Sequence, residues 1–233
     1  LPTSACIIQE KLKLSTSCMS FDVNQGCSGF VYGLAIASSL IANKLSKKTL
    51  MICADTYTKY IDEHDRTCRP IFSDGAAAIL IKSSNTSSIG PFELGTDGKG
   101  AMNLIVENSG ARIDKKNSQK KLFMNGSKVF MFSMSEVPKC VENLLDKANK
   151  KISDIDLFIF HQASKVVLDN IIRRLNLPDE KVFCNYSSVG NTVSASIPIA
   201  IKDALNKGVL KNDKLVMIVG FGVGYSWGAT LMK

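Results

Sequence analysis

The chain has 233 residues, 45% of them hydrophobic, which is enough to bury a sizeable core as one large domain or two small ones. Its 29 Lys and Arg against 21 Asp and Glu give a formal net charge of +8, compatible with an anionic partner or with a merely lysine-rich surface. No apolar run reaches the roughly 18 to 20 residues of a membrane helix and no secretion signal opens the chain, so we expect a soluble cytoplasmic protein without a membrane segment.

Strands and helices alternate along the chain, which indicates an α/β fold. Residues 1 to 95 and 96 to 233 are expected to form two halves, because the Gly-rich and polar stretch 82 to 100 and the charged loop 112 to 121 interrupt the alternation. The chain lacks an initial Met and begins in a helix-start pattern, so we also expect natural sequence ahead of Leu1. Helical spacing occurs at 3 to 13, 28 to 43, 127 to 150, 163 to 175 and 192 to 207, and strand-like runs occur at 20 to 23, 49 to 54, 76 to 81, 156 to 161, 181 to 185, 214 to 219 and 227 to 233.

Two of the predicted helices, 28 to 43 and 192 to 207, are lined by small or apolar residues on every face over most of their length. A helix of this kind must be covered all round, which predicts sheets on both sides of a buried helical layer. Pro198 in the second helix predicts a kink or a shifted start. Each helix follows a strand and a turn and precedes two more strands, so the sequence also indicates an internal repeat.

Cys27 lies between Gly26 and Gly29, in VNQGCSGF, where a predicted strand gives way to the first buried helix. Its sulfur would lie near unpaired backbone N–H groups and the positive end of the helix dipole, a setting that stabilises the nucleophilic thiolate. The alternative is a buried structural cysteine. A catalytic partner nearby would decide between them.

Two polar residues elsewhere in the chain could be such partners. His161 closes the apolar strand in FIFHQAS, where the carboxyl ends of strands in α/β sheets present functional groups, although a hydrogen-bonded core histidine fits the same pattern. Asn191, in SSVGNTVSAS, opens the second buried helix and by itself is compatible with a helix cap.

The glycine-rich stretch VGFGVGYSWG, 219 to 228, looks like a dinucleotide-binding fingerprint, but it leads into a strand instead of a helix. Tight backbone packing with free N–H groups that hold an oxyanion fits it better.

Three kinds of site are not expected. Seven cysteines without paired spacing argue against a disulfide framework and favour a reducing compartment. Two histidines and no Cys-x-x-Cys pair leave almost no ligands for a metal. The basic run RIDKKNSQKK, 112 to 121, lacks interleaved aromatic residues and is expected to be a solvated loop, so nucleic acid is not an expected partner.

Taken together, NQGCSGF, FSDGAAA, HQAS, GNTVSASIP and GFGVGYSWG resemble, in order and spacing, the motifs of the β-ketoacyl-acyl-carrier-protein synthase III family. The resemblance runs over the whole chain. It implies a thiolase-like fold of two similar halves in alternating helix and sheet layers, usually dimeric, with the family's first strands and helices preceding Leu1. It also implies no tightly bound cofactor, with acyl-CoA and malonyl-acyl-carrier-protein as substrates.

The same resemblance assigns roles to individual residues. Cys27 would be the nucleophile that accepts the acyl group, with His161 and Asn191 as hydrogen-bond donors for decarboxylation of the malonyl thioester. The oxyanion would be held by backbone N–H groups of Cys27 and of the loop Gly222, Val223 and Gly224.

Further positions match family residues that contact the substrate. Arg66 matches an arginine that packs against the CoA adenine, Gly126 and Phe130 match positions along the pantetheine tunnel, and Leu1 matches an acyl-pocket residue contributed across the dimer.

Two departures concern substrate binding and the oxyanion loop. Ser164 replaces a family Asn near the pantetheine arm. Val223 replaces a loop glycine, and its backbone donor is kept only if its φ is negative.

The sequence leaves two alternatives to the condensing enzyme open. One is a thiolase-fold acyltransferase or specialised synthase of secondary metabolism or surface-polysaccharide assembly, which Ser164 and Val223 leave open. The other is a non-catalytic partner subunit, which the presence of all three polar groups argues against.

Overall fold

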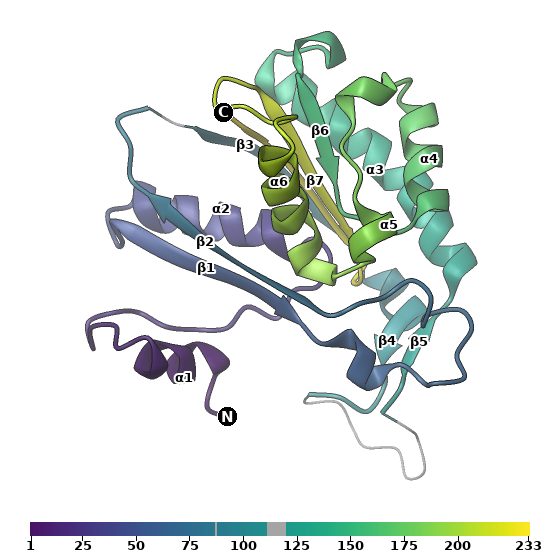
Figure 1. Cartoon of the computed structure of the whole chain (residues 1–233), viewed down its shortest axis with the longest axis horizontal. Helices are drawn as coiled ribbons and strands as arrows, with labels where there is room; N and C mark the ends of the chain where they lie inside the picture. Colours follow the sequence, from purple (N-terminus) through teal and green to yellow (C-terminus); the bar gives the residue numbers. More distant parts are fainter. Residues whose placement is uncertain (87, 111–119) are drawn as a thin grey trace.

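Helices and sheets alternate as layers in the protein (Figure 1). The structure, a computed structural model, describes residues 1–86, 88–110 and 120–233. The helices are α1 (Ser4–Lys11), α2 (Gly29–Ala42), α3 (Gly126–Ala148), α4 (Lys165–Arg174), α5 (Tyr186–Val189) and α6 (Ser196–Asn206). The strands are β1 (Lys48–Asp55), β2 (Gly75–Lys82), β3 (Ile89–Thr96), β4 (Leu104–Val106), β5 (Leu122–Met124), β6 (Leu157–Phe160), β7 (Val216–Gly222) and β8 (Ser226–Met232), with short 3-10 helices that include η2 (Gly98–Asn103) and η5 (Val193–Ala195).

A four-stranded sheet in the order β3-β8-β7-β6 forms the centre of the fold. Strands β6 and β7 are parallel, and β8 pairs antiparallel with both β7 and β3. Every residue of β6 and β7 is buried, because helices cover both faces of the sheet, and this accounts for their continuous apolar runs. The other strands form the antiparallel pairs β1-β2 and β4-β5.

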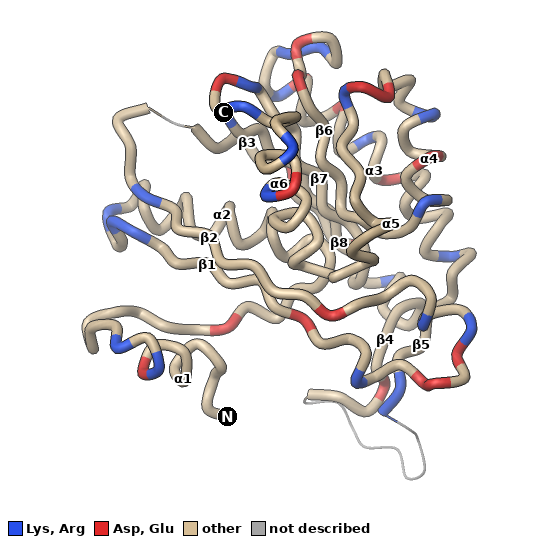
Figure 2. The backbone as a smooth tube through the Cα atoms, in the orientation of Figure 1, with Lys and Arg blue, Asp and Glu red and all other residues tan. Residues whose placement is uncertain are grey.

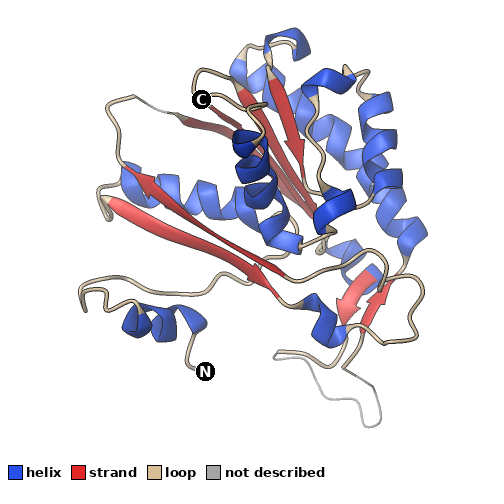
Figure 3. Cartoon of the chain, viewed as in Figure 1, coloured by secondary structure: helices blue, strands red, loops and turns tan. Residues whose placement is uncertain are grey.

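The buried helices α2 and α6 form the layer between the four-stranded sheet and the β1-β2 pair (Figure 3). Helix α2 packs on β1 from one side and on β3, β7 and β8 from the other, and α6 packs on β2 and β6. The absence of charge from α2, β6, β7 and β8 (Figure 2) suits this position. The expected helical layer between sheets is therefore confirmed.

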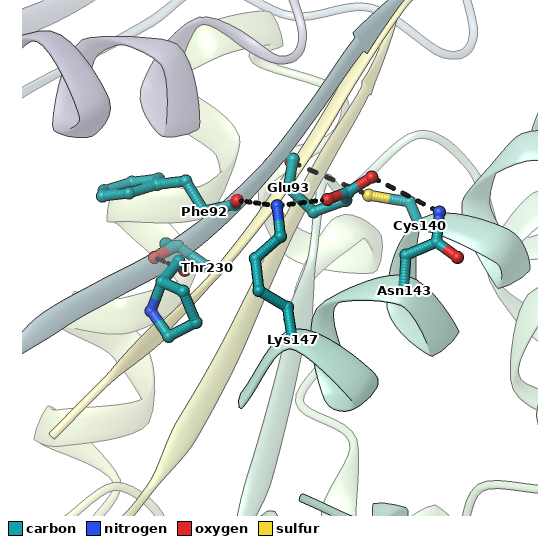
Figure 4. A network of polar contacts seen from close by, with 7 residues as sticks. Phe92, Glu93, Cys140, Asn143, Lys147 and Thr230 are labelled. Atoms are coloured by element: carbon teal, nitrogen blue, oxygen red, sulfur yellow. Dashed lines mark hydrogen bonds and ion pairs between the residues drawn. The ribbon is translucent and has the colours of Figure 1, made fainter. Parts of the chain in front are cut away.

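Helix α3 packs against α4 and covers the outer face of the four-stranded sheet. Figure 4 shows Lys147 of α3 reaching the edge strand β3, where its Nζ donates to the Phe92 carbonyl at 2.8 Å and pairs with Glu93 at 2.6 Å. Asn143 also donates to Glu93, at 3.3 Å. These contacts join the longest helix to the edge of the sheet.

Most of the predicted elements are present, and the short strands β4 and β5 are additional to them. Residues 20 to 23 are not a strand, and 181 to 185 contribute only an isolated bridge between Val182 and Phe158. The stretch 82 to 100, expected to be a break, contains β3, and its pairing with β8 supplies the hydrogen bonds that its Gly and Pro residues made unexpected. The boundary near residue 95 falls at the end of β3 and stays a prediction.

The repeat is visible as a buried helix followed by an antiparallel strand pair, α2-β1-β2 in the first half and α6-β7-β8 in the second. Pro198 lies in the first turn of α6, which starts at Ser196 after η5, so the expected shifted start is confirmed. Most of the basic run 112 to 121 lies outside the described residues.

Candidate active site

Cys27 lies in the turn directly before α2 and is 3% exposed. The following residue, Ser28, hydrogen-bonds through its hydroxyl to Ser226 at 2.7 Å and accepts from Gln25 Nε2 at 3.0 Å. The turn is therefore fixed to β8, which holds the thiol in one place.

The β7-β8 turn covers the thiol. A Cβ built on Gly222 would stand 2.7 Å from Cys27 Cβ and 2.8 Å from its Sγ, so only glycine fits beside the sulfur. The backbone N–H groups of Val223 and of Cys27 itself act on the thiol and lower its pKa. Val223 is not among the described non-glycine residues with positive φ, which meets the condition for keeping its donor.

Burial is the largest influence on the thiol and raises the pKa of Cys27 to about 12, with a smaller contribution in the same direction from Asp55. The N–H groups do lower the pKa, as the sequence predicts, but burial of the sulfur outweighs them in the resting protein. At neutral pH the group is a thiol, and a base must take its proton before it can attack.

His161 follows β6 directly and is 1% exposed. Its backbone N–H donates to the Val219 carbonyl at 2.7 Å, its Nδ1 lies 2.7 Å from Ser196 Oγ, and its ring meets that of Phe221 edge-on, with centroids 5.6 Å apart. Burial lowers the pKa of His161 to about 3, with a smaller opposing effect from the Val193 carbonyl. The imidazole is therefore neutral at neutral pH, with one N–H and one lone pair available for hydrogen bonds.

Asn191 is buried between α5 and η5. Its Oδ1 accepts from the Val193 N–H at 3.0 Å, and its Nδ2 donates to the Ala163 carbonyl at 3.3 Å. Its main chain donates to Ile71 and accepts from Ser73, both at 2.9 Å, so the segment before β2 fixes its position.

Val193 connects the three predicted residues. Its side chain packs in the same apolar cluster as Cys27. Its carbonyl accepts a hydrogen bond from the His161 ring, and its N–H donates to Asn191 Oδ1. The fold therefore brings Cys27, His161 and Asn191 around one residue, although they come from three distant parts of the sequence. Val193 has φ 56°, a left-handed conformation that is rare for a β-branched residue and is typical of functional sites.

Cys27 belongs to a cluster of packed, mainly apolar side chains. The buried members of this cluster are Cys27, Cys68, Phe72, Leu104, Leu122 and Val193.

Three residues at the site had no assigned role in the sequence. Asp55 ends β1 and accepts from both the N–H and the hydroxyl of Ser194, which ties β1 to η5. Its place at the end of a predicted strand was the available signal. Ser196 and Val193 carried no comparable signal, because small residues in a buried helix indicate packing.

The remaining predicted positions are more scattered. Arg66 is exposed in the loop that leads to β2, and Gly126 is exposed at the start of α3, with Phe130 half-buried one turn later. Ser164 caps α4 by accepting from the Val167 N–H at 3.4 Å. Leu1 is fully exposed and is not among the residues packed around Cys27, so its predicted place in an acyl pocket would need another protomer.

Within the described residues, no group of three His, Cys, Asp or Glu side chains could hold a metal ion. No helix in residues 1–86, 88–110 and 120–233 has both the length and the apolar character needed to cross a membrane.

Comparison with known proteins agrees with this architecture. Residues 21–98 match the family model for 3-oxoacyl-[acyl-carrier-protein] synthase III, and residues 145–233 match that for its C-terminal part. The β-ketoacyl-[acyl-carrier-protein] synthase III of Natranaerobius thermophilus is 38% identical and that of Clostridium tetani 35%, each aligned with all of this chain and 73% of the relative.

A solved 3-oxoacyl-(acyl-carrier-protein) synthase III has 38% identity and a TM-score of 0.97, and all of this chain covers 74% of that one. That of Thermus thermophilus has a TM-score of 0.92 at 33% identity, over all of this chain and 72% of the other. With a layered thiolase fold and identity of this level over its whole length, the chain belongs to the β-ketoacyl-acyl-carrier-protein synthase III family.

Proposed function

We propose that the chain catalyses the decarboxylating condensation of an acyl-CoA primer with malonyl-acyl-carrier-protein, which gives a β-ketoacyl-acyl-carrier-protein and starts fatty-acid synthesis. The observation that carries this proposal is the convergence of a buried thiol, a neutral imidazole and a carboxamide around Val193.

In the first half-reaction His161 takes the proton of Cys27, and the sulfur attacks the thioester carbonyl carbon. The new C–S bond forms, the bond to the CoA sulfur breaks, and CoA leaves as a thiol with the proton from the imidazolium. The N–H groups of Cys27 and Val223, at the turn Gly222, Val223 and Gly224, stabilise the negative oxygen of the intermediate.

In the second half-reaction the malonyl thioester loses CO2, and the electron pair of the broken C–C bond forms an enolate. His161 Nε2–H and Asn191 Nδ2–H donate to its oxygen. The enolate carbon attacks the acyl carbonyl carbon, a new C–C bond forms, the C–S bond to Cys27 breaks, and the released thiolate takes a proton from solvent to regenerate the thiol. One such donor is worth about 10²- to 10³-fold in rate.

The substrate arm is assigned to residues on two sides of the site. Arg66 contacts the CoA adenine, Gly126 and Phe130 line the pantetheine path, and Ser164 lies one residue beyond the Ala163 carbonyl that holds Asn191. The exposure of Arg66 and Gly126 supports contact with a ligand that enters from solvent.

The protein acts as a cytoplasmic homodimer without a tightly bound cofactor, with Leu1 reaching the acyl pocket of the other protomer. Seven free cysteines support a reducing compartment. Exposed apolar side chains support contact with another protein surface, and they include Ile7, Leu12, Met19, Phe21, Val23, Leu50 and Ile52. Light scattering of the purified protein measures the oligomeric state, and a monomer at micromolar concentration would contradict the dimer.

The experiment is intact-protein mass spectrometry after incubation with a panel of acyl-CoAs, followed by malonyl-acyl-carrier-protein and measurement of CO2. We expect an acyl adduct that Cys27→Ala abolishes and Cys140→Ala, which removes another buried thiol, does not. His161→Ala and Asn191→Ala should lower CO2 release by about 10²- to 10³-fold, while the exposed His64→Ala has no effect.

Two outcomes would contradict the proposal. An adduct without CO2 or β-ketoacyl product would favour simple acyl transfer, and no adduct with any thioester would favour a non-catalytic subunit.

A further inference from the structure

Ser196 is the side-chain hydrogen-bond partner of one ring nitrogen of His161, Nδ1. It is the first residue of α6 and is 1% exposed, and its Oγ lies 2.7 Å from His161 Nδ1. The same oxygen accepts from the Gln162 N–H at 3.3 Å. A hydroxyl that accepts from one neighbour still has a second lone pair and an O–H bond that can rotate.

The surrounding chain holds this pair rigidly. Gln162 Nε2 donates to the Phe160 carbonyl at 2.8 Å, and its Oε1 accepts from the N–H groups of Asn185 at 2.8 Å and Tyr186 at 3.2 Å. These contacts fix Gln162, so its N–H donates to Ser196 Oγ whichever ring nitrogen of His161 carries the proton. No carboxylate contributes to the pKa of His161 among the described residues, where burial and the Val193 carbonyl set it.

The two half-reactions proposed above require opposite states of the imidazole. Taking the proton from Cys27 needs a lone pair on Nε2 and therefore an N–H on Nδ1. Donating to the enolate oxygen needs an N–H on Nε2 and therefore a lone pair on Nδ1. A carboxylate partner could only accept from Nδ1 and a backbone N–H could only donate to it, whereas a hydroxyl can do either.

We propose that Ser196 is a positioning residue that hydrogen-bonds His161 Nδ1 in both neutral tautomers, accepting from Nδ1–H during acyl loading and donating to Nδ1 during condensation. This inference rests on the proposed function. It adds a group that touches neither substrate nor thiol but keeps the ring in one orientation through both steps. Between the half-reactions Nδ1 loses its proton and Nε2 gains one by exchange with solvent, and the Ser196 O–H bond rotates to follow the change.

The test compares Ser196→Ala, which removes the hydroxyl, with Ser196→Thr, which keeps it. Acyl-adduct formation and CO2 release are measured separately. We expect Ser196→Ala to lower kcat of both half-reactions by about 10- to 100-fold with KM for acyl-CoA unchanged, and Ser196→Thr to restore most of the loss. The matched control is Ser133→Ala, because Ser133 is also 1% exposed and donates within α3 to the Val129 carbonyl.

A spectroscopic arm reads the same bond without turnover. The chain has two histidines, so ¹⁵N-histidine NMR of a His64→Gln background reports His161 alone. Ser196→Ala should move the Nδ1 resonance and change the tautomer ratio, and Ser196→Thr should not. If Ser196→Ala does not fold, Ser196→Cys replaces it, because it has nearly the same size and a much weaker hydrogen bond.

Unchanged Nδ1 resonances in the alanine or cysteine variant would overturn the proposal, as would loss confined to one half-reaction, which would mean a single tautomer. If the unmodified protein forms no adduct at all, the proposed function fails, and the NMR arm alone decides whether Ser196 sets the tautomer.

Discussion

Replacing Gly222 with Ala should displace the nucleophile as well as destabilise the fold. The new Cβ would have two neighbours within 4 Å, Cys27 Cβ at 2.7 Å and Cys27 Sγ at 2.8 Å. Nonbonded carbon contacts lie at about 3.5 to 4.0 Å, so the thiol must retreat by roughly 0.7 to 1.2 Å. A displacement of about 1 Å at a reacting atom can cost about 10²-fold, and we expect acyl loading to slow by that amount.

The same substitution also affects stability. Gly222 has φ 155°, where a side chain costs about 1 to 3 kcal/mol, and the crowding adds about 1 to 3 kcal/mol. Two glycines separate these contributions, because neither has an atom within 4 Å of an added Cβ. Gly208 has φ 69° and should lose about 1 to 2 kcal/mol as Ala, while Gly98, whose φ is not positive, should change by less than about 0.5 kcal/mol.

Urea unfolding gives the stabilities, and timed mass spectrometry with acyl-CoA gives the loading rates. Gly208→Ala and Gly98→Ala should load Cys27 at the rate of the unmodified protein. A folded Gly222→Ala protein that also loads at that rate would refute the placement of the β7-β8 turn against the sulfur.

Three further predictions concern stability. Burial lowers the pKa of His161 to about 3, so below pH 6.5 the unfolded chain binds more protons than the folded one, and the free energy of unfolding should decrease as the pH is lowered, by up to ~1.4 kcal/mol per pH unit. His161→Gln should flatten this slope in urea titrations between about pH 4.5 and 6.5. An unchanged slope would count against this prediction. Val193 has φ 56°, so Val193→Gly should lower the free energy of unfolding in urea less than Val193→Ala does. The reverse order is expected at Val137 inside α3, where glycine is the poorer helix former. The same order at both sites would be inconsistent with the left-handed backbone. Lys147→Ala should lower the free energy of unfolding by no more than about 1 kcal/mol, because the lysine side chain is half exposed. A double-mutant cycle with Glu93→Gln should give a coupling energy in that range, and a much larger coupling energy would contradict the prediction.

The sequence predicts the layers well because they follow from local patterns. An all-apolar helix such as α2 has to be covered, and runs such as β7 have to be buried. Strand β3 escapes prediction because its two glycines and a proline weaken the local signal, and its partner β8 lies more than a hundred residues away. The three-residue strands β4 and β5 are too short to produce a pattern at all.

The site divides in the same way. Cys27, His161 and Asn191 lie at element boundaries, where the sequence itself marks a turn. Ser196 looks like packing until the fold places it against His161. The protonation state of the Cys27 thiol could not be predicted either. It depends on how completely segments distant in the sequence bury Cys27, which only the folded structure shows.

The main-chain bridge between residues 71 to 73 and Asn191 has a consequence for altering this protein. The loop that carries Arg66 runs directly into the segment that fixes the Asn191 backbone, with one hydrogen bond on either side of Phe72. Exchanging that loop for one from another protein, as a means of accepting a different thioester, would therefore also reset the carboxamide. Transplants that keep Ile71 to Ser73 unchanged have the better chance of altering selectivity without losing turnover.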